Sequence, residues 1–314
     1  MEKIKEKGSK KVELNYAITL DVGGTFLKTA IVGSDGSIFK GSFRQVPINS
    51  QGSAEEILDT FTQTLTSFLG IAKNSQIRLI GIGIAIPGPF NYEKGISLMK
   101  KDKFRGIYGI NLKDEFRKRL RLEEDFLILF EPDSWAFLRG EVWCGAGRNG
   151  YSRLVGITLG TGLGTTFMID NQIIIRGQGV PPGGWIAGLP FGGKMPEDRI
   201  SRRGIIARYK ELKGGEYSGD LDVKEIALQA LNEKDKISLQ VFEEYGFYLG
   251  EILKLYLTRF KAEYLILGGQ ISKSFSLFEK PLRNQLKSVP GLKKITLAQN
   301  IDLSPLYGVA RLIQ

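Results

Sequence analysis

An aspartate followed by two glycines and a threonine ends the first apolar segment of the chain. Asp21 closes the run "YAITLD", and Gly23, Gly24 and Thr25 precede a second apolar run, "FLKTAIV". Both runs are short and rich in β-branched and aromatic residues, which is typical of strands. Glycines let backbone N–H groups approach an anion, and a threonine hydroxyl adds a donor. The turn is therefore a candidate anion site with a carboxylate beside it.

A similar turn follows an apolar run in the second half of the chain. Its residues are Gly160, Thr161, Gly162 and Gly164, between the runs "LVGITL" and "TTFMI". In both halves the glycine turn leads to a second strand, a polar turn and a third strand, within 16–42 and 154–178. The spacing is too long for a solenoid repeat. It predicts two similar halves whose turns hold a polyphosphate from both sides of a cleft, and chance similarity of two hairpins is the alternative.

The residue types present restrict the chemistry. The 314-residue chain has no histidine and one cysteine, Cys144. A Ser-His-Asp triad, a Cys-His pair and a His-ligated metal are therefore excluded, and a general base must be Asp, Glu, Lys or Tyr. A single cysteine also excludes an internal disulfide and suits a reducing cytoplasm.

Two common phosphate-binding motifs are approached but not completed. The segment "GLPFGGKM" ends in Met195, where a P-loop needs a hydroxyl for Mg²⁺, and it follows no clear strand. The segment "GTGLGT" has Thr165 where a dinucleotide-binding motif has its last glycine, and it continues into a strand. We therefore exclude both motifs.

Apolar periodicity predicts strands that alternate with helices. Ser53 and Glu56 form a capping pattern, and the apolar helix face that follows extends to Leu69. The other predicted elements are strands at 78–88 and 125–130, helices at 112–121, 134–141, 236–260 and 305–313, and a strand, Gly-Gly turn and helix within 263–275. This order predicts an α/β fold with helices outside mixed or parallel sheets. Ligands in such folds bind beyond the C-terminal ends of the strands.

The composition is that of a globular chain with a basic surface. The net charge is +10, and the densest basic cluster, Lys3 to Lys11, lies in a segment that we expect to be a flexible tail. That tail lacks an apolar signal segment and is too short for a helix-turn-helix domain. The longest apolar run ends at Pro87, too early for a membrane span. We expect a cytoplasmic protein without a membrane or nucleic-acid partner, although the charge would also suit an anionic ligand or nucleic acid.

Five segments together resemble the ROK family of sugar kinases, within the sugar kinase and actin-like ATPase superfamily. The two glycine turns are similar to the family's two phosphate motifs, and "YLILGGQIS" is similar to its adenosine motif. The segment "GIGIAIPGPFNYEKG" resembles the sugar-side strand and loop. The segment "PDSWAFLRGEVWCGAG" (132–147) resembles the segment of the catalytic aspartate, with Glu141 and 145–147 in place.

The resemblance implies two actin-like ATPase (ribonuclease H-like) domains with a cleft between them. We place one domain at 1–131, joined by the last helix at about 303–314, and the other at 132–302. The resemblance further implies ATP with Mg²⁺ as phosphoryl donor and the hydroxyl of a hexose or amino sugar as acceptor, as in a glucokinase. We also expect a homodimer.

The resemblance assigns roles to particular residues. Asp133 would take the proton of the sugar hydroxyl, Asp21 would orient Mg²⁺ through bound water, and Gly268 and Gly269 would let the backbone approach the adenosine. The phosphates would be held by the amides of Gly23, Gly24, Thr25, Gly160, Thr161, Gly162 and Gly164. Two alternatives remain open. Asp133 also fits a helix N-cap, and Lys28 either faces the phosphates or is a solvated strand lysine.

The sugar side departs from the family pattern. Pro132 replaces the asparagine that precedes the catalytic aspartate, and Trp185 and Gly188 replace a glutamate and a histidine that contact the sugar. The cysteine-rich zinc motif is missing, so no structural zinc is expected. Glu197 matches the family's other sugar-side glutamate, or it is an ordinary acid in the first turn of a helix.

Two functional hypotheses follow. In the first, the chain is an ATP-dependent sugar kinase of atypical specificity, and Trp185 stacks on an apolar sugar face. In the second, it is a non-catalytic nucleotide- or sugar-binding regulator on the same fold, and the indole fills the pocket. Because lost polar contacts discriminate strongly between ligands, standard glucokinase specificity is not expected.

Overall fold

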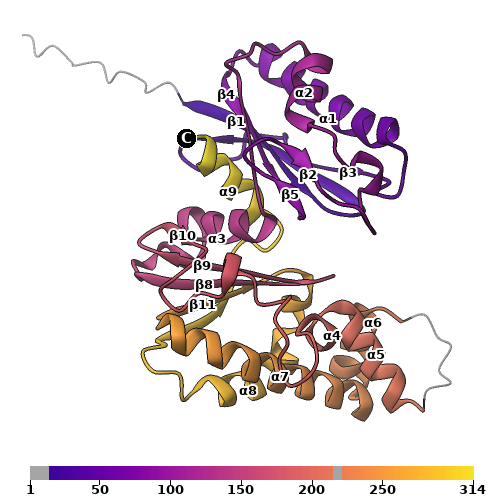
Figure 1. Ribbon diagram of the computed structural model, residues 1–314, viewed down its shortest axis with the longest axis vertical. Coiled ribbons are helices and arrows are strands. Elements are labelled where there is room, and N and C mark those ends of the chain that lie inside the picture. Colours follow the sequence, from indigo (N-terminus) through magenta and orange to yellow (C-terminus); the bar gives the residue numbers. More distant parts are fainter. Residues whose placement is uncertain (1–13, 215–220) are drawn as a thin grey trace, which may run out of the picture.

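The computed structural model describes residues 14–214 and 221–314, and the two halves of the chain lie one above the other in Figure 1. The basic cluster at 3–11 lies outside the described residues. Each half contains a five-stranded sheet. In spatial order the first sheet consists of β3 (Arg44–Pro47), β2 (Phe26–Gly33), β1 (Asn15–Val22), β4 (Arg78–Ala85) and β7 (Leu127–Glu131). The second consists of β10 (Gln172–Ile174), β9 (Leu163–Ile169), β8 (Arg153–Leu159), β11 (Tyr264–Gly268) and β12 (Lys294–Leu297).

The two sheets share one topology. In each sheet the first three strands in the chain are antiparallel neighbours, and two parallel strands follow on the other side of the first strand. Shorter elements connect them, among them β5 (Phe90–Asn91), β6 (Ile96–Ser97), η1 (Arg105–Ile107), η3 (Pro182–Gly184) and η5 (Gln270–Ser274). The prediction of two similar halves, each opening with a glycine turn between two strands, is confirmed.

The third strand of the first half lies later than predicted. After the turn at 35–36, Ile38 makes a single bridge to Val32, and β3 begins only at Arg44. The Ser42 hydroxyl accepts a hydrogen bond from the Ile31 backbone N–H at 3.0 Å. The Ser42 side chain therefore takes the place of a strand partner for the Ile31 N–H. For this reason the third of the three strands predicted within 16–42 is wrong.

Helices cover the outer faces of both sheets, as predicted. On the first sheet lie α1 (Ala54–Asn74) and α2 (Leu112–Leu120), and Ser53 caps α1 by accepting the Glu56 N–H at 3.2 Å. On the second sheet lie α7 (Lys236–Phe260), which has the predicted bounds, and α8 (Phe275–Leu286). The remaining helices of the second half are α4 (Glu197–Ile200), α5 (Arg202–Leu212) and α6 (Val223–Leu228).

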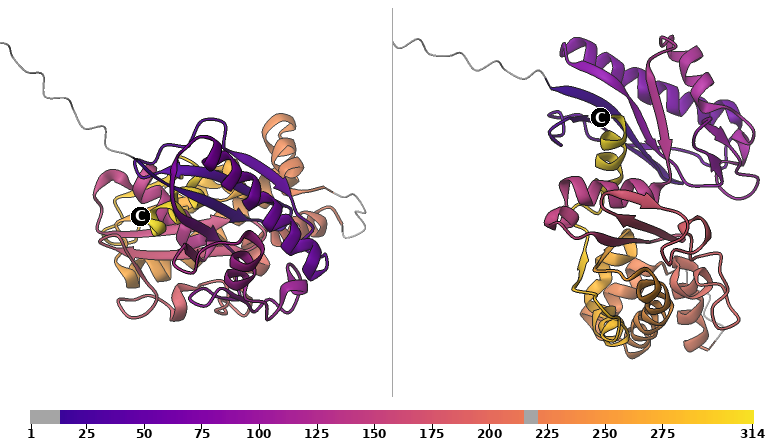
Figure 2. Two further views of the ribbon diagram at one scale, coloured as in Figure 1. Left: turned by 90° about the horizontal axis from the view of Figure 1, so that it is seen from above. Right: turned by 60° about the vertical axis from the view of Figure 1, so that its left-hand side comes forward.

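Two helices lie between the sheets (Figure 2). They are α3 (Asp133–Cys144) and α9 (Ser304–Ile313). On one side, Val309 of α9 packs on Gly83 of β4, and on the other, Phe137 of α3 packs on Gly268 of β11. The last helix thus returns to the first sheet, as predicted.

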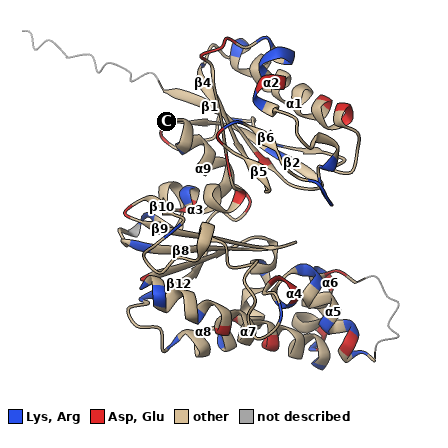
Figure 3. Cartoon of the chain, in the orientation of Figure 1, with Lys and Arg blue, Asp and Glu red and all other residues tan. Residues whose placement is uncertain are grey.

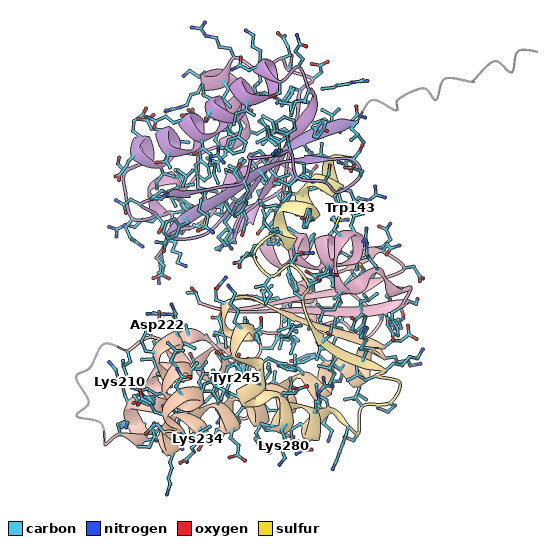
Figure 4. All side chains as sticks on the ribbon, turned by 180° about the vertical axis from the view of Figure 1, so that it is seen from behind. Trp143, Lys210, Asp222, Lys234, Tyr245 and Lys280 are labelled. Carbon is cyan, nitrogen blue, oxygen red and sulfur yellow. The ribbon has the colours of Figure 1, made fainter. Side chains whose placement is uncertain are left out.

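The two central helices cross at unusually close range. Gly140 of α3 faces the Ser304 carbonyl, and Gly308 of α9 faces the Ala136 carbonyl, so a Cβ at either glycine would collide with the opposing backbone. Trp143 lies beside α9 in Figure 4 and packs against its apolar side chains. The halves of the molecule are therefore joined by a helix crossing that requires glycine on both sides.

A buried carboxylate fixes the approach to this crossing. Glu141 is fully buried and accepts hydrogen bonds from the backbone N–H groups of Ala146, Gln299 and Asn300 at 2.8, 2.9 and 3.1 Å. It also accepts a hydrogen bond from the Ser304 hydroxyl. Four donors from two distant segments thus satisfy one charge, which ties the end of α3 to the start of α9.

Candidate active site

The first glycine turn joins β1 to β2. Gly23 donates its N–H to the Phe26 carbonyl at 3.0 Å, which closes the turn. Within the part of the chain that the structure describes, the N–H groups of Gly24 and Thr25 have no acceptor. Both groups are open to solvent, so an anion can replace water as their hydrogen-bond acceptor. The Gly23 N–H is used by the turn itself, and its contact with a phosphate stays a prediction.

Asp21 ends β1 in an environment that disfavours its charge. Burial raises the pKa of Asp21 to about 7, Lys28 opposes this rise, and the charges of Asp133 and Asp302 add to it. A carboxylate crowded by two others is stabilised by a cation. Mg²⁺ binds few carboxylates and keeps several waters, so the residues present here fit a hydrated Mg²⁺ ion.

Lys28 forms an ion pair, so it is neither free to face the phosphates nor simply a solvated strand lysine. Lys28 lies opposite Asp21 in the strand pairing, and its Nζ donates a hydrogen bond to Asp302 Oδ1 at 2.9 Å. Asp302 also accepts hydrogen bonds from Gln270 and Lys273, at 2.9 and 3.0 Å. Burial raises the pKa of Asp302, but these three hydrogen bonds outweigh it and hold the pKa well below its usual range. Asp302 therefore links β2 of the first half to η5 of the second.

The second glycine turn joins β8 to β9. Gly160 donates its N–H to the Gly162 carbonyl at 3.1 Å, so Thr161 and Gly162 carry the remaining turn N–H groups. The Glu197 carboxylate lies against Gly162 and accepts the Leu163 N–H at 3.1 Å. Glu197 is thus a first-turn acid of α4 that also contacts this glycine turn, and its contact with a sugar stays a prediction.

Gly164 does not belong to the turn. It lies inside β9 and pairs with Thr158 of β8. A Cβ at this position would lie 2.9 Å from the Ser134 Cβ. The glycine is therefore needed for close packing of α3 on β9, and this packing brings the second turn to the start of α3.

Asp133 is the first residue of α3. Its Oδ1 accepts the Ser134 N–H at 2.7 Å, while Pro132 occupies the N-cap position without a side-chain hydrogen bond. The alternative that Asp133 is the N-cap is therefore wrong, because Asp133 is the first helical residue and bonds the N–H of the next residue. Although the side chain is exposed, the surrounding protein raises the pKa of Asp133, and the Ser134 hydrogen bond and the charge of Lys103 oppose that rise. A raised pKa suits a general base near neutral pH.

The segment with the predicted adenosine contact lies at the same sheet edge as the second turn. Gly268 ends β11 opposite Thr158, and Gly269 follows with a φ of +82°, a region that favours glycine. A Cβ on Gly269 would also collide with the Leu159 backbone at the end of β8. Gly269 therefore serves the turn after β11 and its packing on β8, and contact of this segment with the adenosine stays a prediction.

Sequence reasoning missed two side chains near Asp133. Lys103 lies against Gly24, and its charge lowers the pKa of Asp133. The Tyr92 hydroxyl donates to the Ile86 carbonyl at 3.2 Å, and its pKa is raised by burial and by the Asp133 charge. Neither residue stands in an element with a periodic pattern. A lysine within the run "KKDK" is typical of a solvated loop, so the sequence offered no signal for it.

Trp185 lies on the surface of the second half. Its side chain is 57% exposed, and a Cβ on Gly188 would lie 2.9 Å from the indole. The Thr165 hydroxyl bonds both neighbours of the tryptophan, Gly184 and Ile186, and fixes this segment to β9. The indole is thus held in place by its backbone, and its contact with a sugar stays a prediction.

Three further observations concern the surface charge, the metal-binding residues and the hydropathy of the helices. Lys and Arg alternate with Asp and Glu over the helices of both halves in Figure 3. In residues 14–214 and 221–314, no group of three or more Cys, Asp or Glu side chains is placed to hold a metal ion directly. No helix among these residues is long and apolar enough to cross a membrane.

Two α/β halves of one topology, with α3 and α9 packed between their sheets, define the two-domain actin-like ATPase fold. The chain belongs to the ROK family, whose model matches residues 17–314.

Relatives of this chain include kinases and repressors. A glucokinase of Thermotoga maritima is 24% identical over 95% of this chain and 96% of its own length. The xylose repressor of Bacillus subtilis is 24% identical over 87% of this chain and 69% of its own length. A crystal structure of a ROK family glucokinase from Streptomyces griseus, in complex with glucose and AMPPNP, has a TM-score of 0.70 at 22% identity and covers 95% of this chain and 98% of its own.

Proposed function

We propose that this chain is an ATP-dependent sugar kinase that phosphorylates a hydroxyl of a hexose or amino sugar, with Asp133 as general base. The observation that carries the proposal is the position of the Asp133 carboxylate, which starts α3 and is near enough to Asp21, beside the first glycine turn, for the two charges to interact. The similarity to glucokinases over almost the full chain supports it. The proposal includes domains at 1–131 with 303–314 and at 132–302, and a homodimer in the cytoplasm.

The chain's own residues supply positioning and charge stabilisation, which are the main protein contributions to phosphoryl transfer. Asp133 accepts the proton of the acceptor hydroxyl. The free N–H groups of Gly24 and Thr25 would bind phosphate oxygens, and the turn at 160–162 would bind them from the other half. Asp21 would hold Mg²⁺ through water, and the bound ion neutralises phosphate charge. The backbone at 268–269 would lie against the adenosine.

The test is an ADP-release assay with Asp133→Asn across hexoses, N-acyl amino sugars and nucleosides. Loss of a general base typically costs about 10²–10⁴ in rate, so turnover should nearly vanish while ATP affinity stays close to that of the wild type. Asp114→Asn is the matched control, because Asp114 is also an exposed acid in the first turn of a helix but belongs to α2. Equal loss of turnover and ATP affinity in Asp133→Asn would show that the residue acts only as a helix cap.

A non-catalytic regulator on the same fold is the second candidate. The match to a xylose repressor and the replacements at Pro132, Trp185 and Gly188 favour it. A regulator would bind ATP or a sugar tightly without turnover of any acceptor in the panel. Salt-sensitive DNA binding at low ionic strength would instead indicate that the basic surface binds nucleic acid.

A further inference from the structure

Lys103 belongs to a backbone segment whose conformation is fixed by a neighbouring residue in the core. It lies between Asp102 and Phe104, whose φ angles of +59° and +61° are uncommon for residues with side chains. Phe104 is fully buried in the core of the first half, and its N–H bonds the Ser50 carbonyl at 2.6 Å. Such conformations persist only where the surrounding structure imposes them. The position of Lys103 is therefore fixed by its neighbour in the core.

The Lys103 ammonium has no ion pair. Across the described ranges, 14–214 and 221–314, no carboxylate lies within 4.0 Å of it and no hydrogen bond involves it. The side chain is nevertheless partly buried. Lys28, the lysine that the sequence suggested for the phosphates, is paired with Asp302 at 2.9 Å. Lys103 is thus a better candidate than Lys28 for binding an anionic ligand.

The side chain of Lys103 lies directly on the first glycine turn. A Cβ on Gly24 would lie 2.5 Å from the lysine Cε and 2.7 Å from its Nζ. The free N–H groups of Gly24 and Thr25 are on this same turn. Asp133 is near enough for the lysine charge to act on it. The ammonium therefore lies against the first glycine turn and acts on the carboxylate that we propose as base.

We propose that Lys103 binds the phosphoryl group in transit, as a catalytic residue of the kinase reaction. The inference rests on the proposed function. In the step, the bond from the acceptor oxygen to the γ-phosphorus forms and the bond from phosphorus to the ADP oxygen breaks. The hydroxyl proton goes to Asp133, and Lys103 keeps its protons. A fixed cation costs no reorganisation when charge spreads over the equatorial oxygens of the phosphoryl group.

Steady-state kinetics of Lys103→Met and Lys103→Arg provide the first test. Loss of one preorganised charge-stabilising group typically costs about 10²–10³ in kcat. We expect a loss of that size in Lys103→Met, little change in the KM for ATP, and partial recovery in Lys103→Arg. Lys101→Met is the matched control, because Lys101 is exposed in the same segment, and its kcat should equal that of the wild type.

Binding of ADP·Mg²⁺ with and without tetrafluoroaluminate provides a test that needs no acceptor. The anion resembles the phosphoryl group in transit, so it should increase ADP affinity in the wild type and in Lys101→Met, but not in Lys103→Met. Affinity for ADP alone should be equal in all three. If the wild type turns over no sugar but shows this dependence on Lys103, the proposed function fails and the lysine site stands.

Two results would overturn the role of Lys103. One is an unchanged gain from tetrafluoroaluminate in Lys103→Met. The other is an increase only in the KM for acidic acceptors, with neutral sugars unaffected, because the lysine would then recognise the acceptor. Circular dichroism and thermal midpoints of both Lys103 variants show that the comparison is made on folded protein.

Discussion

Removal of the Glu141 side chain should strongly destabilise the chain. The Glu141→Ala variant would leave three partly buried backbone N–H groups and the buried Ser304 hydroxyl without their acceptor. An unsatisfied buried polar group costs about 1–3 kcal/mol, and the space left by the side chain can admit water, so the lower end applies. Four donors then predict a loss of about 4 kcal/mol. That is a large part of the ~5–15 kcal/mol by which native domains are stable.

Urea unfolding followed by tryptophan fluorescence measures this loss. Trp143 lies two residues after Glu141 on α3 and packs against α9, so it reports on the affected region. Glu279→Ala on α8 is the matched control. Its carboxylate is an exposed partner of Arg283 at 2.7 Å, one helical turn away, and such pairs contribute about 0.3–0.5 kcal/mol.

The expected result is a free energy of unfolding that falls by about 4 kcal/mol in Glu141→Ala and hardly changes in Glu279→Ala. Glu141→Gln should also lose more than the control, because an amide NH₂ cannot accept from an N–H group. If Glu141→Ala loses no more stability than Glu279→Ala at an unchanged denaturant slope, the four hydrogen bonds do not hold the two segments together.

Two further predictions concern the same central region. Because the folded pKa of Asp21 is about 7, above its ordinary 3.8, ionised Asp21 destabilises the fold as pH rises. Asp21→Asn should therefore raise the free energy of unfolding at pH 8 by about 2 kcal/mol, with the partial exposure of Asp21 taken into account. This gain should disappear by about pH 4. An equal gain at both pH values in urea titrations would contradict the assigned pKa. Gly140→Ala should lower the thermal midpoint through a cost of about 1–3 kcal/mol, because the new Cβ meets the Ser304 carbonyl; an unchanged midpoint would mean that α3 and α9 can separate at no cost.

The elements that could be predicted are those whose local signals agree with their packing. The α7 helix has the predicted bounds, 236–260, because its buried apolar residues repeat at helical spacing and face one core. The cap at Ser53 was also predictable, since it depends on residues three positions apart. The third strand expected within 16–42 failed because the Ile31 N–H is bonded by the Ser42 side chain and not by a backbone carbonyl.

The candidate site could be predicted only where glycine or an acid marks it. The glycine turns and Asp133 stand in recognisable contexts, and the structure brings their segments together. The use of the Gly23 amide inside the turn, the strand position of Gly164 and the ion pair of Lys28 depend on contacts between distant segments. Lys103 reaches Gly24 from a loop about 80 residues away in the sequence, and no local pattern encodes that approach.

The return of α9 to the first sheet has a consequence for biosynthesis. The apolar side chains of Ala30 and Val32 are covered by Leu306 and Ala310. The ribosome makes those covering residues long after the strand that they cover, although amino-terminal domains generally fold first during translation. One apolar face of the nascent amino-terminal half therefore stays exposed to solvent until α9 has been synthesised. A chain made without α9 would keep that apolar face uncovered.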